Sequence, residues 1–262
     1  MQAFRILHGV RIASLSPAST EILFALGAGE QIVCTDQFSN EPPAARALAH
    51  LRGMTDVDAE ALRTHAPEAV LLGTSIQAKL AEKLRAAELP VVYHDPRTLA
   101  QIYEWIRLLG TIVGCDKAAG ELILRMQQGF NDIKRKGALL PRKPRVYIEE
   151  WHQPPFASGN WVPEMVRIAG GEPYPVAAGA LSPEVTLAQV QAFNPELIVV
   201  SWCGAGALAD PTLLTKRPGW DALPAVQAGC VRVIDDSLLN RPGPRLPEGA
   251  ARLFAWLFEL LH

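Results

Sequence analysis

The sequence has few of the residues that build redox or metal centres. It has four cysteines among 262 residues, and no two of them form a CxxC pair. This spacing argues against a zinc ribbon and against a thioredoxin-like motif. None of the six histidines has another histidine four positions away, so we expect no dedicated zinc or manganese site. The cysteines are expected to be free and mostly buried thiols.

The chain also lacks an excess of charge and long apolar runs. Its 25 Lys and Arg residues against 27 Asp and Glu residues give a net charge of −2, which provides no general attraction for nucleic acid or anionic lipid. The longest apolar runs, such as residues 22–26 and 197–200, are far shorter than the ~20 residues that span a bilayer. Residues 1–9 contain no apolar segment typical of an export signal. We therefore expect a soluble protein, which stays in the cytoplasm if the chain is complete as given.

Common nucleotide-binding and hydrolase motifs are absent. There is no GxGxxG after a strand-like run and no GxxxxGK[ST], and the segment around Ser158 lacks the leading glycine of GxSxG. The adjacent carboxylates of Glu149 and Glu150 would point to opposite faces of a strand, so they are poorly placed to share one substrate. One of them is expected to face a ligand or to pair with an arginine such as Arg145. We predict no catalytic residues.

Strand-like and helical runs alternate through the first third of the chain. This alternation is typical of an α/β domain with a largely parallel sheet. The strand-like runs are residues 10–15, 31–35, 69–72 and 90–94, and the helical runs are residues 22–26, 58–65 and 76–88.

A long helical pattern separates two similar halves. Residues 98–136 carry apolar side chains at spacings of three and four, with a break near Cys115. The second half repeats the first, since Pro67-Glu68 and Pro195-Glu196 each precede a buried strand-like run. The pattern predicts two Rossmann-like α/β lobes, residues 1–97 and 138–262, joined by a long interdomain helix at residues 98–137.

Several motifs spread over nearly the whole chain resemble the substrate-binding proteins of vitamin B12 and iron-siderophore ABC transporters, the class III periplasmic binding proteins. The cobalamin-binding branch is the most similar. The motifs are residues 12–27 (IASLSPASTEILFALG), Asn40-Glu41-Pro42-Pro43, Glu150-Trp151, residues 154–159 (PPFASG), residues 161–165 (WVPEM), residues 169–172 (AGGE) and residues 240–246 (NRPGPRL).

The resemblance implies a non-enzymatic binding protein that holds cobalamin or another corrinoid in a cleft between two lobes and delivers it to an ABC permease. It implies no intrinsic cofactor, a monomer and a periplasmic or other extracytoplasmic location. Family members carry a permease-docking glutamate on each lobe, whereas this chain has Gln77-Ala78-Lys79 at the first position and no Glu in residues 206–216 at the second. The alternatives are an iron-siderophore or haem binding protein, and an intracellular chaperone or enzyme acting on a tetrapyrrole.

The candidate binding residues lie in loops that follow strand-like runs. A flat macrocycle needs broad aromatic walls and a few hydrogen-bonding groups. Trp151, Trp161 and Trp202 are the proposed stacking walls, and each could instead belong to the core. His152 could supply an axial imidazole to a metal already held by a chelate, or it could simply face solvent. Ser16 is a further candidate, and its alternative role is simply to cap the helix that follows it. Arg241 and Arg245 could clamp an anionic group on the ligand or hold a lid. The remaining candidates are Phe38 and Phe156.

Overall fold

The computed structural model describes residues 9–262. The segment 1–9, in which we found no export signal, lies outside the described residues except for Gly9. The described chain forms two compact units. One contains the residues up to Pro96 together with Ala100–Arg125, and the other contains Arg97–Leu99 together with Met126–His262.

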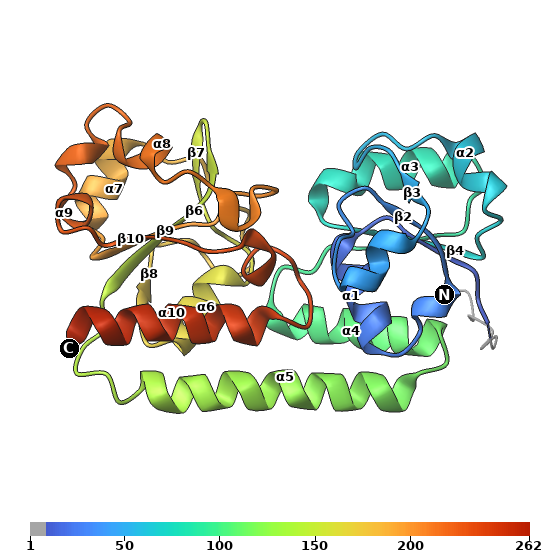
Figure 1. The fold of residues 1–262 in the computed structure, drawn as a ribbon, viewed down its shortest axis with the longest axis horizontal. Helices are drawn as coiled ribbons and strands as arrows, with labels where there is room; N and C mark the ends of the chain where they lie inside the picture. The colour runs from blue at the N-terminus through green and yellow to red at the C-terminus, as the bar shows by residue number, and fades with distance from the viewer. Residues whose placement is uncertain (1–8) are drawn as a thin grey trace. The chain divides into compact units, whose positions relative to one another are not determined.

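Unit 1 is built on a five-stranded parallel sheet with the order β3-β2-β1-β4-β5. Helices α1 and α4 cover one face of this sheet, and α2 and α3 cover the other (Figure 1). The elements are β1 (Ile12–Ser14), α1 (Pro17–Ala25), β2 (Ile32–Asp36), β3 (His50–Leu51), α2 (Ala59–Thr64), β4 (Ala69–Gly73), α3 (Ala78–Ala86), β5 (Val91–His94) and α4 (Leu99–Ile112).

Local sequence explains how this unit forms. Helix α2 begins after Asp58, whose carboxylate accepts hydrogen bonds from the backbone N–H groups of Glu60 and Ala61 at 3.1 and 3.4 Å. Strand β4, which lies between β1 and β5, is buried along its whole length, as a parallel strand covered on both faces must be. Its Val70 and Leu72 contribute to the core under α2 and α3.

Unit 2 contains a second sheet with the order β10-β9-β6-β7, and β8 also pairs with β6. Strand β7 is antiparallel to β6, and the other pairings are parallel. Helices α6 and α10 lie on one face of the sheet and α7 on the other (Figure 1). The elements are β6 (Arg145–His152), β7 (Pro155–Ala157), α6 (Val162–Ile168), β8 (Glu172–Pro173), α7 (Leu187–Phe193), β9 (Leu197–Val200), α8 (Thr212–Thr215), α9 (Pro224–Gln227), β10 (Val231–Val233) and α10 (Leu246–Leu261).

Helix α5 (Asp116–Gly137) belongs to both units, because the division falls between Arg125 and Met126. It follows α4 after a break at residues 113–115, in which Gly114 has a φ of +68°. Short 3-10 helices occupy Gly29–Gln31, Pro43–Ala47, Ser75–Gln77, Gly206–Leu208, Trp220–Ala222 and Asp236–Leu238. Among residues 9–262, no helix combines the length and the apolar content needed to cross a bilayer.

The predicted fold class, two α/β lobes with parallel sheets, is confirmed. The break between α4 and α5 was predicted correctly, and β9 has the predicted bounds. Strands β3, β7, β8 and β10 were not predicted, because each has only two or three residues and forms by pairing with a longer neighbour. Helix α10 begins at Leu246, and Pro247 fits its first turn.

Candidate ligand-binding site

Large exposed apolar side chains follow strands at the carboxyl edge of each sheet. In unit 1, Phe38 follows β2 and is 41% exposed, and Ile76 follows β4 and is 56% exposed. In unit 2, Trp151 near the end of β6 is 43% exposed, and Leu208 follows β9. The carboxyl edge of an α/β sheet is the usual place for ligand-binding loops. These side chains give each unit an apolar surface at that edge.

The end of β6 presents an aromatic group centred on His152. Its ring centroid lies 5.4 Å from that of Trp151 and 4.8 Å from that of Trp202. The Trp151 Nε1–H donates to the carbonyl oxygen of Gln153 at 3.1 Å, which fixes the orientation of the exposed indole. The His152 Nδ1 is buried without a hydrogen-bond partner. The end of β6 and the turn after it therefore combine an indole surface with an imidazole that has one uncommitted nitrogen.

The three proposed tryptophan walls differ in exposure. Trp161 is 3% exposed and its Nε1–H donates to the carbonyl oxygen of Leu239 at 2.7 Å. Trp202 is 4% exposed and belongs to the core of unit 2. Of the three, only Trp151 presents a large indole surface in this structure. Phe156 is half-buried on β7, directly opposite Trp151 in the β6–β7 ladder.

Below this turn, Glu149 is fully buried and accepts hydrogen bonds from three other side chains. Its carboxylate accepts from Arg217 Nη1 and Nη2 at 3.0 and 2.8 Å. It also accepts from the Tyr147 hydroxyl at 2.9 Å and from Trp202 Nε1 at 3.0 Å. The expectation that one of the two glutamates pairs with an arginine is confirmed for Glu149, but the arginine is Arg217 and not Arg145, which pairs with Glu196 just before β9. Arg217 could not be predicted from the sequence, because it lies 68 positions from Glu149 without any local motif.

Burial and the negative charge of Glu149 also affect Tyr147. Desolvation, followed by the nearby carboxylate of Glu149, raises the pKa of the Tyr147 hydroxyl well above its ordinary value. The hydroxyl therefore stays protonated and remains a donor to Glu149.

Glu150 has different partners from Glu149, as expected for neighbours on a strand. Its Oε2 accepts from the Ser182 hydroxyl at 2.5 Å. Burial raises the pKa of the Glu150 carboxyl, and the hydrogen bonds from Ser182 and from the Gly159 N–H oppose this shift. The carboxyl therefore retains a proton to higher pH than an exposed glutamic acid.

In unit 1, Ser16 occupies the N-cap position of α1 but makes no side-chain capping hydrogen bond. Beside it, buried hydroxyl groups connect Ser14, Thr20 and Ser39 through contacts of 2.8 and 2.9 Å. The Ser39 hydroxyl donates to Asp36 at 2.7 Å. This network anchors the loop that carries Phe38.

The remaining candidates lie in unit 2, before and at the start of α10. Arg241 follows the 3-10 helix Asp236–Leu238, and Arg245 immediately precedes α10; both are half-buried.

Gln77, in unit 1 at the position expected for a permease-docking glutamate, is 1% exposed and bonds to Gly73 N–H and the Leu15 carbonyl. Within the described part of the chain, no group of three His, Cys, Asp or Glu side chains could hold a metal ion.

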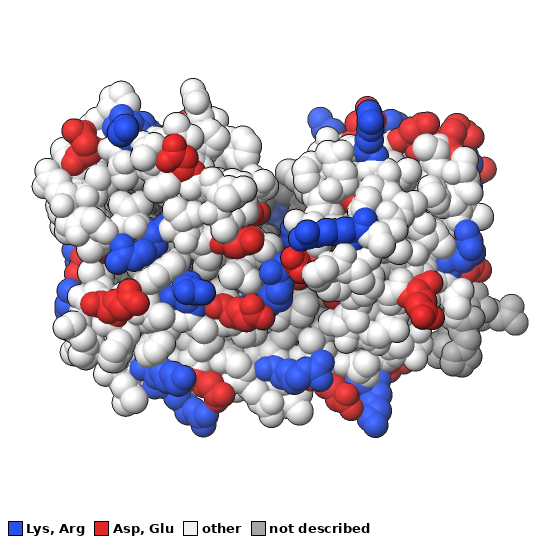
Figure 2. Space-filling view, viewed as in Figure 1, with Lys and Arg blue, Asp and Glu red and all other residues white. Residues whose placement is uncertain are grey.

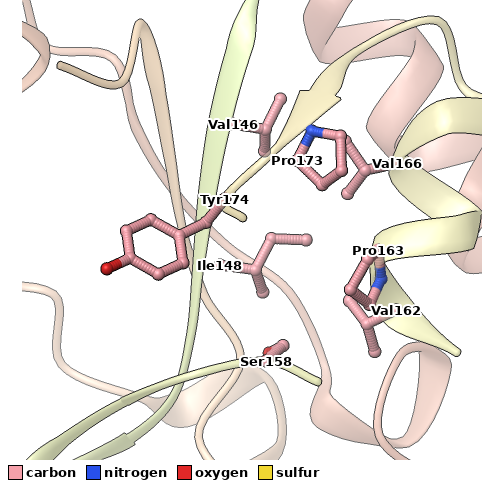
Figure 3. Close-up of a pocket in the computed structure, with 8 residues that line it drawn as sticks. All are labelled: Val146, Ile148, Ser158, Val162, Pro163, Val166, Pro173 and Tyr174. Atoms are coloured by element: carbon pink, nitrogen blue, oxygen red, sulfur yellow. The ribbon is translucent and has the colours of Figure 1, made fainter. Parts of the chain in front are cut away.

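A small pocket lies between β6 and α6 in unit 2. Its walls are mostly aliphatic, and the Tyr174 hydroxyl points away from the other lining side chains (Figure 3). Ser158 contributes a hydroxyl that is buried without a hydrogen-bond partner. The pocket is lined by Val146, Ile148, Ser158, Val162, Pro163, Val166, Pro173 and Tyr174. It is a gap in the packing and is too confined for a macrocycle.

The charged side chains give no sign of a polyanion-binding surface on the face shown in Figure 2. Basic and acidic residues are interspersed there, without a large patch of one sign. The site at the end of β6 is instead defined by aromatic rings.

Comparison with known proteins identifies the class. A model of the family described as periplasmic binding protein matches residues 12–238. The chain belongs to the periplasmic binding protein family, which confirms the resemblance seen in its motifs. This is a family of transport binding proteins and not a family of enzymes.

Individual relatives differ in their named ligands. An ABC transporter substrate-binding lipoprotein from Bacillus subtilis (strain 168) is 28% identical over 253 residues, covering 93% of this chain and 78% of that protein. A vitamin B12-binding protein from Photorhabdus laumondii is 27% identical over 248 residues, covering 93% and 86%. A periplasmic haem-binding protein from Roseiflexus sp. RS-1 has a similar fold, with a TM-score of 0.84 at 22% identity, covering 97% of this chain and all of that one.

Proposed function

We propose that this protein binds a corrinoid, cobalamin or a precursor, and acts outside the cytoplasmic membrane as the substrate-binding component of an ABC importer. The exposed indole of Trp151, held beside His152 at the end of β6, carries the proposal. A flat macrocycle can stack on an indole that is already ordered, so little conformational entropy is lost on binding. Phe38 in unit 1 is a second aromatic side chain with an exposed ring. The protein releases its ligand chemically unchanged.

Haem is the second candidate ligand, and His152 favours it. A neutral imidazole is a common axial ligand of haem iron. His152 has a ring nitrogen without a hydrogen-bond partner, although that nitrogen is buried. The vitamin B12-binding and haem-binding relatives support the two candidates to a similar degree.

The permease partner is part of the same proposal. Neither position expected for a docking glutamate carries one, and Gln77 is buried in unit 1. Contact with a permease would therefore use other surface residues.

Calorimetric titration of the purified protein with cyanocobalamin, cobinamide, hemin and a ferric siderophore tests the ligand. We expect saturable binding of a corrinoid, and an affinity loss of about tenfold in Trp151→Ala, as for a central aromatic contact. The matched control is Phe258→Ala, which removes an aromatic ring 47% exposed on α10.

His152→Ala separates the two candidates. Cyanocobalamin brings both axial ligands of its cobalt, so the loss of an imidazole should change its affinity little. Bound haem with His152 as a ligand should instead show a shifted Soret band in this variant. If none of the four compounds binds, or if Trp151→Ala and Phe258→Ala bind like the wild type, the proposed site is wrong.

A further inference from the structure

The ion pair between Arg217 and Glu149 connects the core of unit 2 to the end of β6 that carries Trp151. Glu149 is fully buried and Arg217 has a side chain that is only 17% exposed. A buried carboxylate without a cationic or hydrogen-bonding partner is strongly destabilising. The two parallel hydrogen bonds from the guanidinium group, at 3.0 and 2.8 Å, meet that requirement.

Arg217 makes a third hydrogen bond besides the two that pair it with Glu149. Its Nη2 also donates to the carbonyl oxygen of His152 at 3.0 Å. The guanidinium carbon lies 4.3 Å from the ring centroid of Trp220, so the group is fixed from a third direction. Because a guanidinium group is planar, these contacts set the position of His152 relative to Glu149.

The regular pairing of β6 with β7 is interrupted near Trp151. The pairing of β6 with β7 is irregular between Glu149 and Trp151, where the register shifts. Such an irregularity interrupts the ladder and bends the strand. Arg217 bonds to Glu149 before this irregularity and to His152 after it, so its hydrogen bonds bridge the place where the ladder is interrupted.

We infer that Arg217 is a positioning residue for ligand binding, which holds the end of β6 that carries Trp151 and His152 in its binding orientation without touching the ligand. This role rests on the proposed function, since it assumes that Trp151 contacts the ligand. It predicts that the effect of Arg217 on affinity passes through Trp151.

The first test needs no ligand. Arg217→Lys keeps a positive charge beside Glu149 but loses the planar fork, so it cannot reproduce all three hydrogen bonds. We expect the variant to fold, and the backbone amides of residues 150–157, apart from Pro154 and Pro155, to exchange hydrogen about tenfold faster than in the wild type. Arg232→Lys is the matched control, because Arg232 lies on β10 in the same unit and its side chain donates to the carbonyl groups of Gly229 and Val231.

The second test measures coupling between Arg217 and Trp151. Titrations with cyanocobalamin and with hemin compare the wild type, Arg217→Lys, Trp151→Ala and the double variant. We expect Arg217→Lys to weaken binding by about tenfold in the wild-type background and by less than about twofold when Trp151 is already absent. A residue with a purely structural role would weaken binding equally in both backgrounds.

Equal losses in both backgrounds, or unchanged exchange at residues 150–157, would overturn the inference. If neither compound binds the wild type, the proposed function fails, while the exchange measurement still decides whether Arg217 holds the end of β6. If Arg217→Lys does not fold, Arg217→Met combined with Glu149→Gln takes its place, since that pair leaves no unpaired buried charge.

Discussion

Glu150 is a half-buried carboxyl group that accepts a hydrogen bond from the Ser182 hydroxyl. Burial raises the pKa of Glu150, and the Ser182 hydroxyl and the Gly159 N–H oppose this effect. Glu149, one position earlier, has the guanidinium group of Arg217 as its partner. Two adjacent glutamates on one strand thus have different electrostatic surroundings, because they face opposite sides of the sheet.

The raised pKa of Glu150 predicts how stability changes with pH. A carboxyl group whose pKa is higher in the folded state stabilises the fold below its unfolded pKa, and this contribution is lost as pH rises through the folded pKa. We therefore expect the free energy of unfolding of the wild type, relative to Glu150→Gln, to fall as pH rises above about 4.3. Urea unfolding of both proteins from pH 4 to pH 7 measures this difference.

Ser182→Ala provides a control with a predictable sign. It removes a hydrogen bond that lowers the pKa of Glu150, so its stability should depend more steeply on pH than that of the wild type. A pH-independent difference between the wild type and Glu150→Gln would contradict the assigned pKa direction.

At the scale of single elements, two of the three glycines of α5, Gly120 and Gly137, lie in opposite environments. Gly120 has open space around the position of a Cβ atom, whereas a Cβ on Gly137 would lie 2.8 Å from the backbone of Ile168 and Ala169. The end of α5 and the end of α6 thus approach closely through backbone atoms that cannot move aside. The same residue type has a packing role at one position and none at the other.

The two glycines predict opposite effects of alanine in one helix. Gly120→Ala should stabilise the protein by about 0.5–1 kcal/mol, because alanine is the better helix former. Gly137→Ala should destabilise it by more than about 1 kcal/mol, since the clash with the end of α6 outweighs the gain in propensity. Urea unfolding of the two variants measures both values, and stabilisation by Gly137→Ala would contradict the close approach of α5 and α6.

The sequence allowed the longer elements to be predicted but not the network at the end of β6. Strand β9 and the break before α5 follow from local patterns of apolar residues and glycine. The pairing of Glu149 with Arg217 depends on how the loop before α8 and the segment after it return to the sheet, and no local pattern encodes that. The burial of Trp161 and Trp202 likewise depends on distant residues such as Leu239 and Glu149.

At the scale of the whole molecule, the two units have separate hydrophobic cores. Leu72 is fully buried in the core of unit 1, and Ile198 is fully buried in the core of unit 2. Replacing a fully buried leucine or isoleucine with alanine typically costs about 2–5 kcal/mol. The two substitutions are therefore matched probes of whether each core is stabilised independently.

Native-state hydrogen exchange of Leu72→Ala and Ile198→Ala tests this independence. We expect Leu72→Ala to accelerate exchange in β1 and β4 but not in β6 and β9, and Ile198→Ala to do the reverse, because each cavity weakens only the core that contains it. Helix α5 gives the most informative signal: its residues 116–125 should respond to Leu72→Ala, and its residues 126–137 to Ile198→Ala. Equal acceleration everywhere by either substitution would show that the two units unfold as one. A helix α5 that responds to neither would instead behave as the separate interdomain element that the sequence pattern predicts.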